Sequence, residues 1–228
     1  AKKPKFKETK GDKKQISVDT TLVKIEESRL VDNILDRLPL IQIANLKISA
    51  ASVKIINKNI KISDIDLKIN RFSVSKNKYQ IKLDKLSGYW DERDIQLENC
   101  SFQLNGTRDY VTLNQFKVQT TGSRFACSAY YGLKDSSNAD LDFYELYIDM
   151  DEAARISEIE KLSNGYLSGT WNFSGEPTDF IFNMNLAGEW QGRNLDKLDA
   201  NFSYNDGLIK VNRLNIQSNA GKVEVKGQ

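Results

Sequence analysis

The sequence predicts a mainly β protein, a sequential antiparallel meander of bent strands that form an elongated, taco-like groove, with two short helices. Runs of about 8 to 14 residues with strand composition follow one another along the chain. Short breakers such as NGTRD, TTGS, GEPTD and YNDG separate these runs. This arrangement is typical of consecutive hairpins rather than βαβ units, so neighbours in sequence are expected to be neighbours in the sheet.

One apolar spacing recurs within these runs and is clearest in KISDIDLKI, residues 61–69. From Ile65 onward, apolar and polar residues alternate as in a half-buried strand. Ile62 lies three residues before Ile65, so in a straight strand the two side chains would face opposite sides. A β-bulge between them would place both on one face. The residues expected at such bulges or bends are 63–64, 84–85, 98–99 and 114–115.

Bulges at equivalent places in successive strands would line up across the sheet and fold it along a crease. The product would be a U-shaped trough with an apolar interior and a polar exterior. The expected lining residues occupy the apolar positions of the motif. They are Ile43, Leu46, Ile48, Ile62, Ile65, Leu67, Leu83, Leu86, Leu97, Phe102, Leu113, Phe116, Val118, Phe143, Leu146, Ile148, Val211, Leu214 and Ile216.

Two segments have helical patterns. The first is predicted at about residues 29–38, where Ser28 is a plausible N-cap and Pro39 ends the pattern. The second, residues 151–164, begins with acidic residues and ends before Gly165. It separates a first β-groove segment, 16–150, from a second, 165–228, within one continuous structure.

The positive charge is concentrated in a predicted flexible tail, residues 1–15. Residues 1–14 hold seven of the 33 basic residues and two of the 31 acidic ones. The tail is either a solvated arm or a segment attracted to anionic lipid headgroups. No basic stripe with interleaved aromatic residues continues into the body, so nucleic acid is not an expected partner.

The residue inventory argues against an enzyme. The chain has no histidine, which removes Ser-His and Cys-His nucleophile pairs and the common zinc sites. It also lacks GxSxG, P-loop and GxGxxG motifs. We therefore expect no catalytic residues, no metal site and no cofactor.

Two acidic groups leave alternatives open. Asp149, Asp151 and Glu152 are expected to cap the following helix, with a calcium site as the alternative. The group of Asp91, Glu92 and Asp94 is expected to form a polar turn, with a paired-carboxylate glycosidase site as the alternative.

Cysteine and aromatic residues also permit two interpretations each. Cys100 and Cys127 are either buried free thiols or a cross-strand disulfide. The aromatic residues either line the core or groove, or form a platform on which sugars stack. These aromatic residues are Tyr89, Trp90, Tyr130, Tyr131, Tyr144, Tyr147, Trp171 and Trp190.

Residues 39–228 resemble the AsmA/TamB-like proteins of Gram-negative bacteria. The resemblance lies in the repeated strand motif, in LPLIQIANLKISAASVKI and in LDKLDANFSYNDGLIKVNRLNIQSNAGKVEVKG. It implies a protein that is anchored in the inner membrane, extends through the periplasm and has no active site. It further implies a repetitive β-groove that moves phospholipid between membranes and supports outer-membrane biogenesis. Family members are usually much longer, so we expect this chain to be a fragment whose anchor lies outside it.

The predicted function is therefore a non-enzymatic groove that binds or conducts the acyl chains of phospholipid. An apolar lining suits this role because each buried methylene contributes about 0.8 kcal/mol without any specific polar contact. The expected partners are phospholipid or another acyl-chain lipid, the membrane, and outer-membrane assembly proteins. The alternative is an extracellular β-sandwich module that binds glycans.

Overall fold

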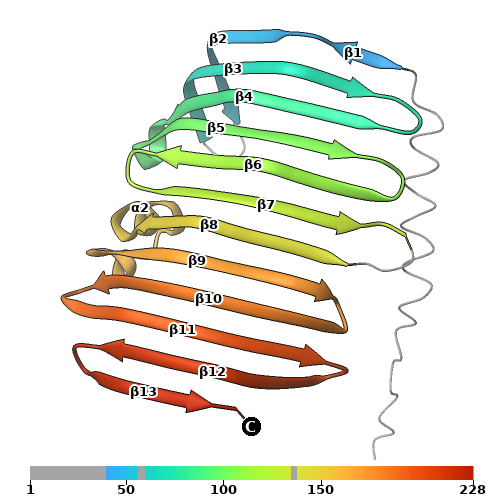
Figure 1. The fold of residues 1–228 in the computed structure, drawn as a ribbon. Helices are drawn as coiled ribbons and strands as arrows, with labels where there is room; N and C mark the ends of the chain where they lie inside the picture. The colour runs from blue at the N-terminus through green and yellow to red at the C-terminus, as the bar shows by residue number, and fades with distance from the viewer. Residues whose placement is uncertain (1–39, 56–59, 135–137, 228) are drawn as a thin grey trace, which may run out of the picture.

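The computed structural model describes residues 40–55, 60–134 and 138–227. They form one thirteen-stranded antiparallel sheet that does not close into a barrel (Figure 1). The predicted fold class, a mainly β meander, is confirmed. The predicted tail at 1–15 and the predicted helix at 29–38 lie outside the described residues.

The strands are long, and short turns connect most of them. They are β1 (Ile41–Ile43), β2 (Leu46–Ile55), β3 (Ile60–Val74), β4 (Tyr79–Trp90), β5 (Ile95–Gly106), β6 (Tyr110–Thr120), β7 (Arg124–Gly132), β8 (Ala139–Asp149), β9 (Gly165–Glu176), β10 (Asp179–Trp190), β11 (Arg193–Asn205), β12 (Leu208–Ser218) and β13 (Gly221–Lys226). The helical elements are the 3-10 turn η2 (Asp91–Arg93), the helix α2 (Met150–Ser157) and the 3-10 turn η3 (Glu160–Leu162).

The strand order follows the sequence. From β3 to β13 each strand pairs with the next, while β1 and β2 both pair with β3 and together form one edge of the sheet. β8 pairs directly with β9, so the sheet continues past α2, which is inserted between them. The predicted second helix is shorter than expected, because Glu158 adopts a left-handed conformation that ends α2.

The bulges predicted from the repeated spacing are confirmed. The pairing register shifts at 63–66 in β3, 83–86 in β4, 97–99 in β5 and 113–116 in β6. A methyl group placed on Gly88 of β4 would lie 3.3 Å from Ile62 Cγ2 and 3.4 Å from Ile65 Cγ1. Ile62 and Ile65 therefore face the same side of the sheet, as expected.

The single crease predicted from these bulges is wrong, because the bulges fall on two lines. Those of β3 and β5 lie opposite Gly88 and Ser87 of β4, respectively. Those of β4 and β6 lie opposite Ser101 and Phe102 of β5. The bulges of β3 and β5 lie near the starts of their strands, whereas those of β4 and β6 lie near the middle of theirs. Because neighbouring strands run in opposite directions, the two pairs of bulges fall on different lines across the sheet. The bending that bulges produce is thus divided between two lines across the sheet.

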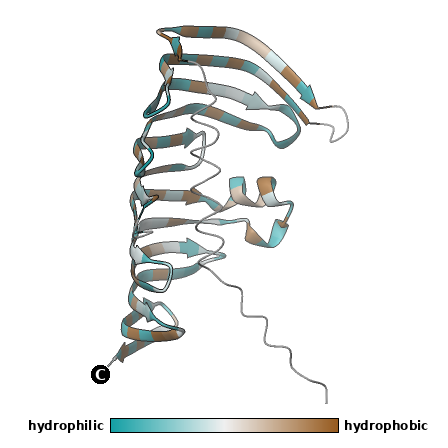
Figure 2. Ribbon diagram, turned by 90° about the vertical axis from the view of Figure 1, so that its right-hand side faces the viewer, coloured by the Kyte–Doolittle hydropathy of each residue, from teal (hydrophilic) through white to brown (hydrophobic). Residues whose placement is uncertain are grey.

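The sheet is a single layer. Figure 2 shows the strands at its β1 end curving toward the side on which α2 lies. Among the described residues, the buried hydrophobic side chains are few and mostly small: Leu83, Ile95, Ala126, Cys127, Ala154 and Ala200. The fold thus has no enclosed core of the kind that a β-sandwich builds between two sheets.

The outer face is held by polar contacts between strands. An asparagine ladder crosses β9 to β12, in which Asn183 Nδ2 donates to Asn172 Oδ1 at 2.8 Å and Asn212 Nδ2 donates to Asn201 Oδ1 at 2.6 Å. Asn201 also donates to Asn183, which joins the two pairs. Cross-strand side-chain pairs of this kind stabilise a sheet that has no second layer.

Candidate functional site

The sheet has one continuous apolar face, and every residue predicted to line the groove lies on it. Residues directly opposite each other in antiparallel strands point to the same side. The partners of Leu83 and Leu86 are Phe102 and Cys100, which are two residues apart on a regular stretch of β5 and so share a face. When the register partners are followed from each strand to the next in the same way, every predicted lining residue falls on this face.

Aromatic rings run across the middle of the apolar face. Phe143 of β8 stacks on Trp171 of β9 with ring centroids 4.3 Å apart, and Trp171 lies 5.6 Å from Phe182 of β10. Phe182 in turn lies 6.5 Å from Phe202 of β11. Only Phe143 belongs to the predicted lining. Trp171 is one of the aromatic residues expected either to line the core or groove or to form a sugar platform. Phe182 and Phe202 were not singled out because neither falls at a position of the repeated spacing, and only the strand register places them on this face.

The apolar face is open at both ends of the sheet. On β1 and β2, Ile43 is 40% exposed and Val53 is 50% exposed. On β13, Val223 is 52% exposed. Contiguous exposed apolar surface of this kind marks a binding surface in soluble proteins.

Helix α2 lies on this face, at the edge where β8 ends and β9 begins. Thr120, whose register partner Leu97 is a lining residue, donates its hydroxyl to Glu152 Oε2 at 2.6 Å. Beside the helix, a pocket of about 440 Å³ is bordered by Met150, Leu167 and Leu195, together with other residues of β9 to β12. This volume lies within the range of small-molecule sites, about 300–1,000 Å³.

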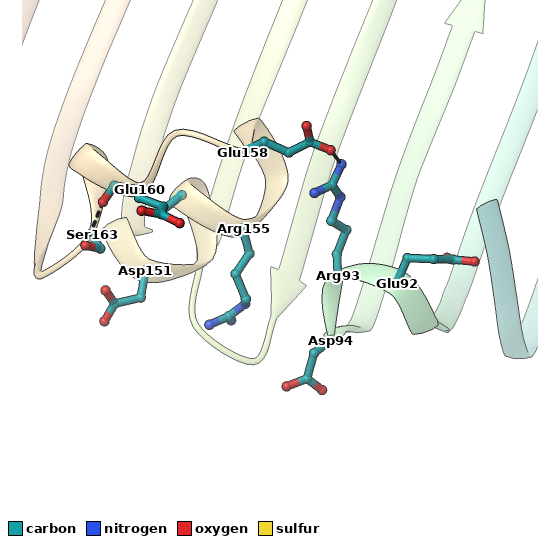
Figure 3. A pocket seen from close by; sticks show the side chains of 9 residues that line it. Glu92, Arg93, Asp94, Asp151, Arg155, Glu158, Glu160 and Ser163 are labelled. Atoms are coloured by element: carbon teal, nitrogen blue, oxygen red, sulfur yellow. Dashed lines mark hydrogen bonds and ion pairs between the residues drawn. The ribbon is translucent and has the colours of Figure 1, made fainter. Parts of the chain in front are cut away.

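A second pocket, about 730 Å³, lies between α2 and η2 and is lined mostly by charged residues (Figure 3). Arg93 of η2 reaches across it to form an ion pair with Glu158 at the end of α2. Five carboxylates border the pocket with Arg93 and Arg155; they are Glu92, Asp94, Asp151, Glu158 and Glu160.

The acidic group at 91–94 forms the predicted polar turn. Hydrogen bonds from Lys61 and then Ser63 hold the pKa of Asp91 below its ordinary value. Asp94 Oδ1 accepts from the Tyr89 hydroxyl at 2.5 Å, and this bond raises the pKa of Tyr89. Glu92 Oε2 accepts from the backbone N–H of Lys61 at 2.9 Å, so each of the three carboxylates is engaged in its own contact.

The acidic group at 149–152 caps α2, as predicted. Asp149 Oδ1 accepts from the backbone N–H of Glu152 at 2.9 Å, which satisfies one free donor at the start of the helix. In the part of the chain that the structure describes, no group of three or more possible metal-binding side chains occurs.

Both cysteines are free thiols, so the disulfide alternative is wrong. Cys127 is buried, and Cys100 is half-buried on the apolar face. Burial raises the pKa of both thiols, and the charge of Asp142 adds to the effect at Cys127.

The aromatic residues considered as a sugar platform are divided between the two faces. Trp90, Trp171 and Trp190 lie on the apolar face, opposite Ile62, Phe143 and Arg193, respectively. The tyrosines at 89, 130 and 147 lie on the outer face. They therefore do not form one platform.

Among the described residues, no helix is long and apolar enough to span a membrane. Comparisons with protein-family models, curated proteins and solved structures found no match to this chain.

Proposed function

We propose that this chain is a non-enzymatic β-groove that binds phospholipid acyl chains and lets them move along it. The observation that supports this proposal most strongly is the continuous apolar face, which runs from β1 to β13 and against which the described part of the chain places no second sheet. A protein that folds only for stability would be expected to cover such a surface.

The uniformity of the apolar face favours conduction over tight capture. Most side chains on it are aliphatic or aromatic, and the same spacing recurs in several strands of both halves of the sheet. Each methylene of an acyl chain would gain about 0.8 kcal/mol wherever it lay on such a surface. A lipid could therefore slide from strand to strand without meeting a deep minimum.

The resemblance to AsmA/TamB-like proteins supplies the proposed setting. In that setting the groove belongs to a longer protein anchored in the inner membrane and lies in the periplasm. It carries phospholipid toward the outer membrane and supports outer-membrane biogenesis, with outer-membrane assembly proteins as partners. The glycan-binding alternative required a β-sandwich, and the single-layer sheet with its divided aromatic residues does not favour it.

A charge placed on the apolar face tests the proposal. Phe182→Glu puts a carboxylate in the aromatic row, whereas Asn183→Glu puts one at the next residue, on the outer face. Each protein is incubated with vesicles of phosphatidylethanolamine and phosphatidylglycerol and repurified, and the bound lipid is quantified by mass spectrometry. We expect the native chain and Asn183→Glu to retain lipid and Phe182→Glu to lose most of it.

A second pair of variants guards against a folding defect in the first. Leu113→Glu on the apolar face and Asn114→Glu on the outer face repeat the test in β6. The circular dichroism of all four variants is compared with that of the native chain. Absence of lipid from the native chain, or equal loss in folded variants of both faces, would overturn the proposal.

A further inference from the structure

The apolar face carries one charged side chain whose position is not explained by the lining pattern. Arg193, the first residue of β11, pairs with Trp190 of β10 and lies two residues before Leu195. Leu195 in turn pairs with Gly188, so Arg193, Trp190 and Leu195 share the apolar face. Among the described strand residues that the register places on this face, Arg193 is the only charged one.

Arg193 has no counter-ion among the described residues. Within the described part of the chain it makes no ion pair or side-chain hydrogen bond, whereas Arg213 farther along the sheet is paired with Asp199 at 2.8 Å. Glu189 also borders the neighbouring pocket, but the register places it on the outer face opposite Asn194. The guanidinium therefore has its full set of donors free for a ligand.

Arg193 lies beside an apolar pocket. Arg193 borders the pocket of about 440 Å³ whose other walls include Met150 of α2 and Leu167, Leu195 and Ile216 of the sheet. The polar end of a ligand can thus lie at the rim while its apolar end enters the pocket. An apolar pocket with a single cation at its rim matches an amphiphile with an anionic headgroup.

We propose that Arg193 binds the anionic headgroup of a lipid, a phosphate or a carboxylate, whose acyl chain starts in this pocket. This inference rests on the proposed lipid-binding function and adds to it a headgroup preference and an orientation. The guanidinium donates paired hydrogen bonds to the oxygens of such a group. The headgroup then lies beside α2, and the acyl chain extends over β9 to β12.

Amphiphiles with one tail and different headgroups test the proposal by isothermal titration calorimetry. Dodecyl phosphate, laurate and the neutral dodecyl maltoside are titrated into the full chain below their micelle concentrations, and inorganic phosphate serves as a probe without a tail. We expect one site per chain that binds dodecyl phosphate or laurate about tenfold more tightly than dodecyl maltoside, as one charge-assisted hydrogen-bond pair would give. The comparison of the two anionic amphiphiles identifies the headgroup.

Arg193→Gln is expected to abolish the anionic preference and leave the binding of dodecyl maltoside unchanged. The matched control is Arg71→Gln, which removes the same charge from an exposed residue on the outer face of β3. Leu195→Trp, which fills the pocket, is expected to remove the tight site for either anionic amphiphile.

The possible failures are distinguishable. If the amphiphiles bind equally well, or if Arg193→Gln keeps the preference, the headgroup site is refuted while the groove remains. Tight binding of inorganic phosphate alone would also refute it, because the site would then be one for a free anion. If no amphiphile binds the native chain, the proposed function fails together with this inference.

Discussion

The bulge in β6 contains a residue whose backbone provides a direct test of the bent-strand architecture. Gln115 has a φ of 52°, a left-handed conformation, and its side chain is exposed. Left-handed backbone at a residue other than glycine costs on the order of 1–3 kcal/mol, and a β-branched side chain lies at the upper end of that range. Gln115→Val is therefore expected to lower the free energy of unfolding by about 1–2 kcal/mol.

Two further substitutions make this prediction specific. Lys117→Val places the same side chain at an exposed, regular strand position two residues away, where β-branched residues are favoured, so the expected change is within about 0.5 kcal/mol. Gln115→Gly relieves about 1–2 kcal/mol of steric cost and adds about 0.5–1 kcal/mol of backbone entropy loss, so a small net gain is expected.

Urea unfolding followed by tryptophan fluorescence measures these changes. With a denaturant dependence of about 3 kcal/mol/M, Gln115→Val should lower the unfolding midpoint by roughly 0.5 M. If it behaves like Lys117→Val, or if Gln115→Gly is the less stable of the two Gln115 variants, then the left-handed bulge does not form at this position.

Three other predictions concern single contacts. Asp149→Ala removes the N-cap of α2 and should lower the free energy of unfolding by about 1 kcal/mol in the same urea assay. The bond from Lys61 lowers the native pKa of Asp91, so its stabilising effect is present at neutral pH and is lost as the pH falls through that lowered value, below the ordinary 3.8. Urea unfolding should accordingly show Asp91→Asn less stable than the native chain at pH 7, with the difference shrinking as the pH falls below 3.8. Burial raises the pKa of Cys127, so iodoacetamide should modify it at least about tenfold more slowly than it modifies glutathione at neutral pH, and equal rates would contradict the buried thiol.

The bulged strands were predictable from the sequence because each bulge is a local event. Where the spacing of apolar residues changes from two to three, as between Ile62 and Ile65, the alternation of side chains between the two faces is interrupted. This interruption can be recognised within one strand, without knowledge of its neighbours. Two lines of bulges instead of one crease could have been deduced from where the bulge lies in each strand, near the start in β3 and β5 and near the middle in β4 and β6. That deduction requires the antiparallel order and the position of the motif in each strand to be considered together.

The headgroup site could not be predicted in this way, because it depends on register. Nothing near Arg193 in the sequence distinguishes it from an exposed arginine at a turn. Its place on the apolar face follows only from the pairing of β10 with β11. The pocket beside it is bordered by Met150, which belongs to α2 and is distant in the sequence. Such contacts are set by the fold as a whole.

The single-layer meander has a consequence for how the chain unfolds. From β4 to β13 each strand is paired only with the described strands adjacent to it in sequence, so the sheet is close to one-dimensional, like a solenoid. Opening can begin at either edge and advance one strand at a time instead of requiring collapse of a shared core. Amide hydrogen exchange should therefore be slowest near β7 and β8 and become faster toward β2 and β13, and uniform protection across the sheet would show that the strands unfold as one unit.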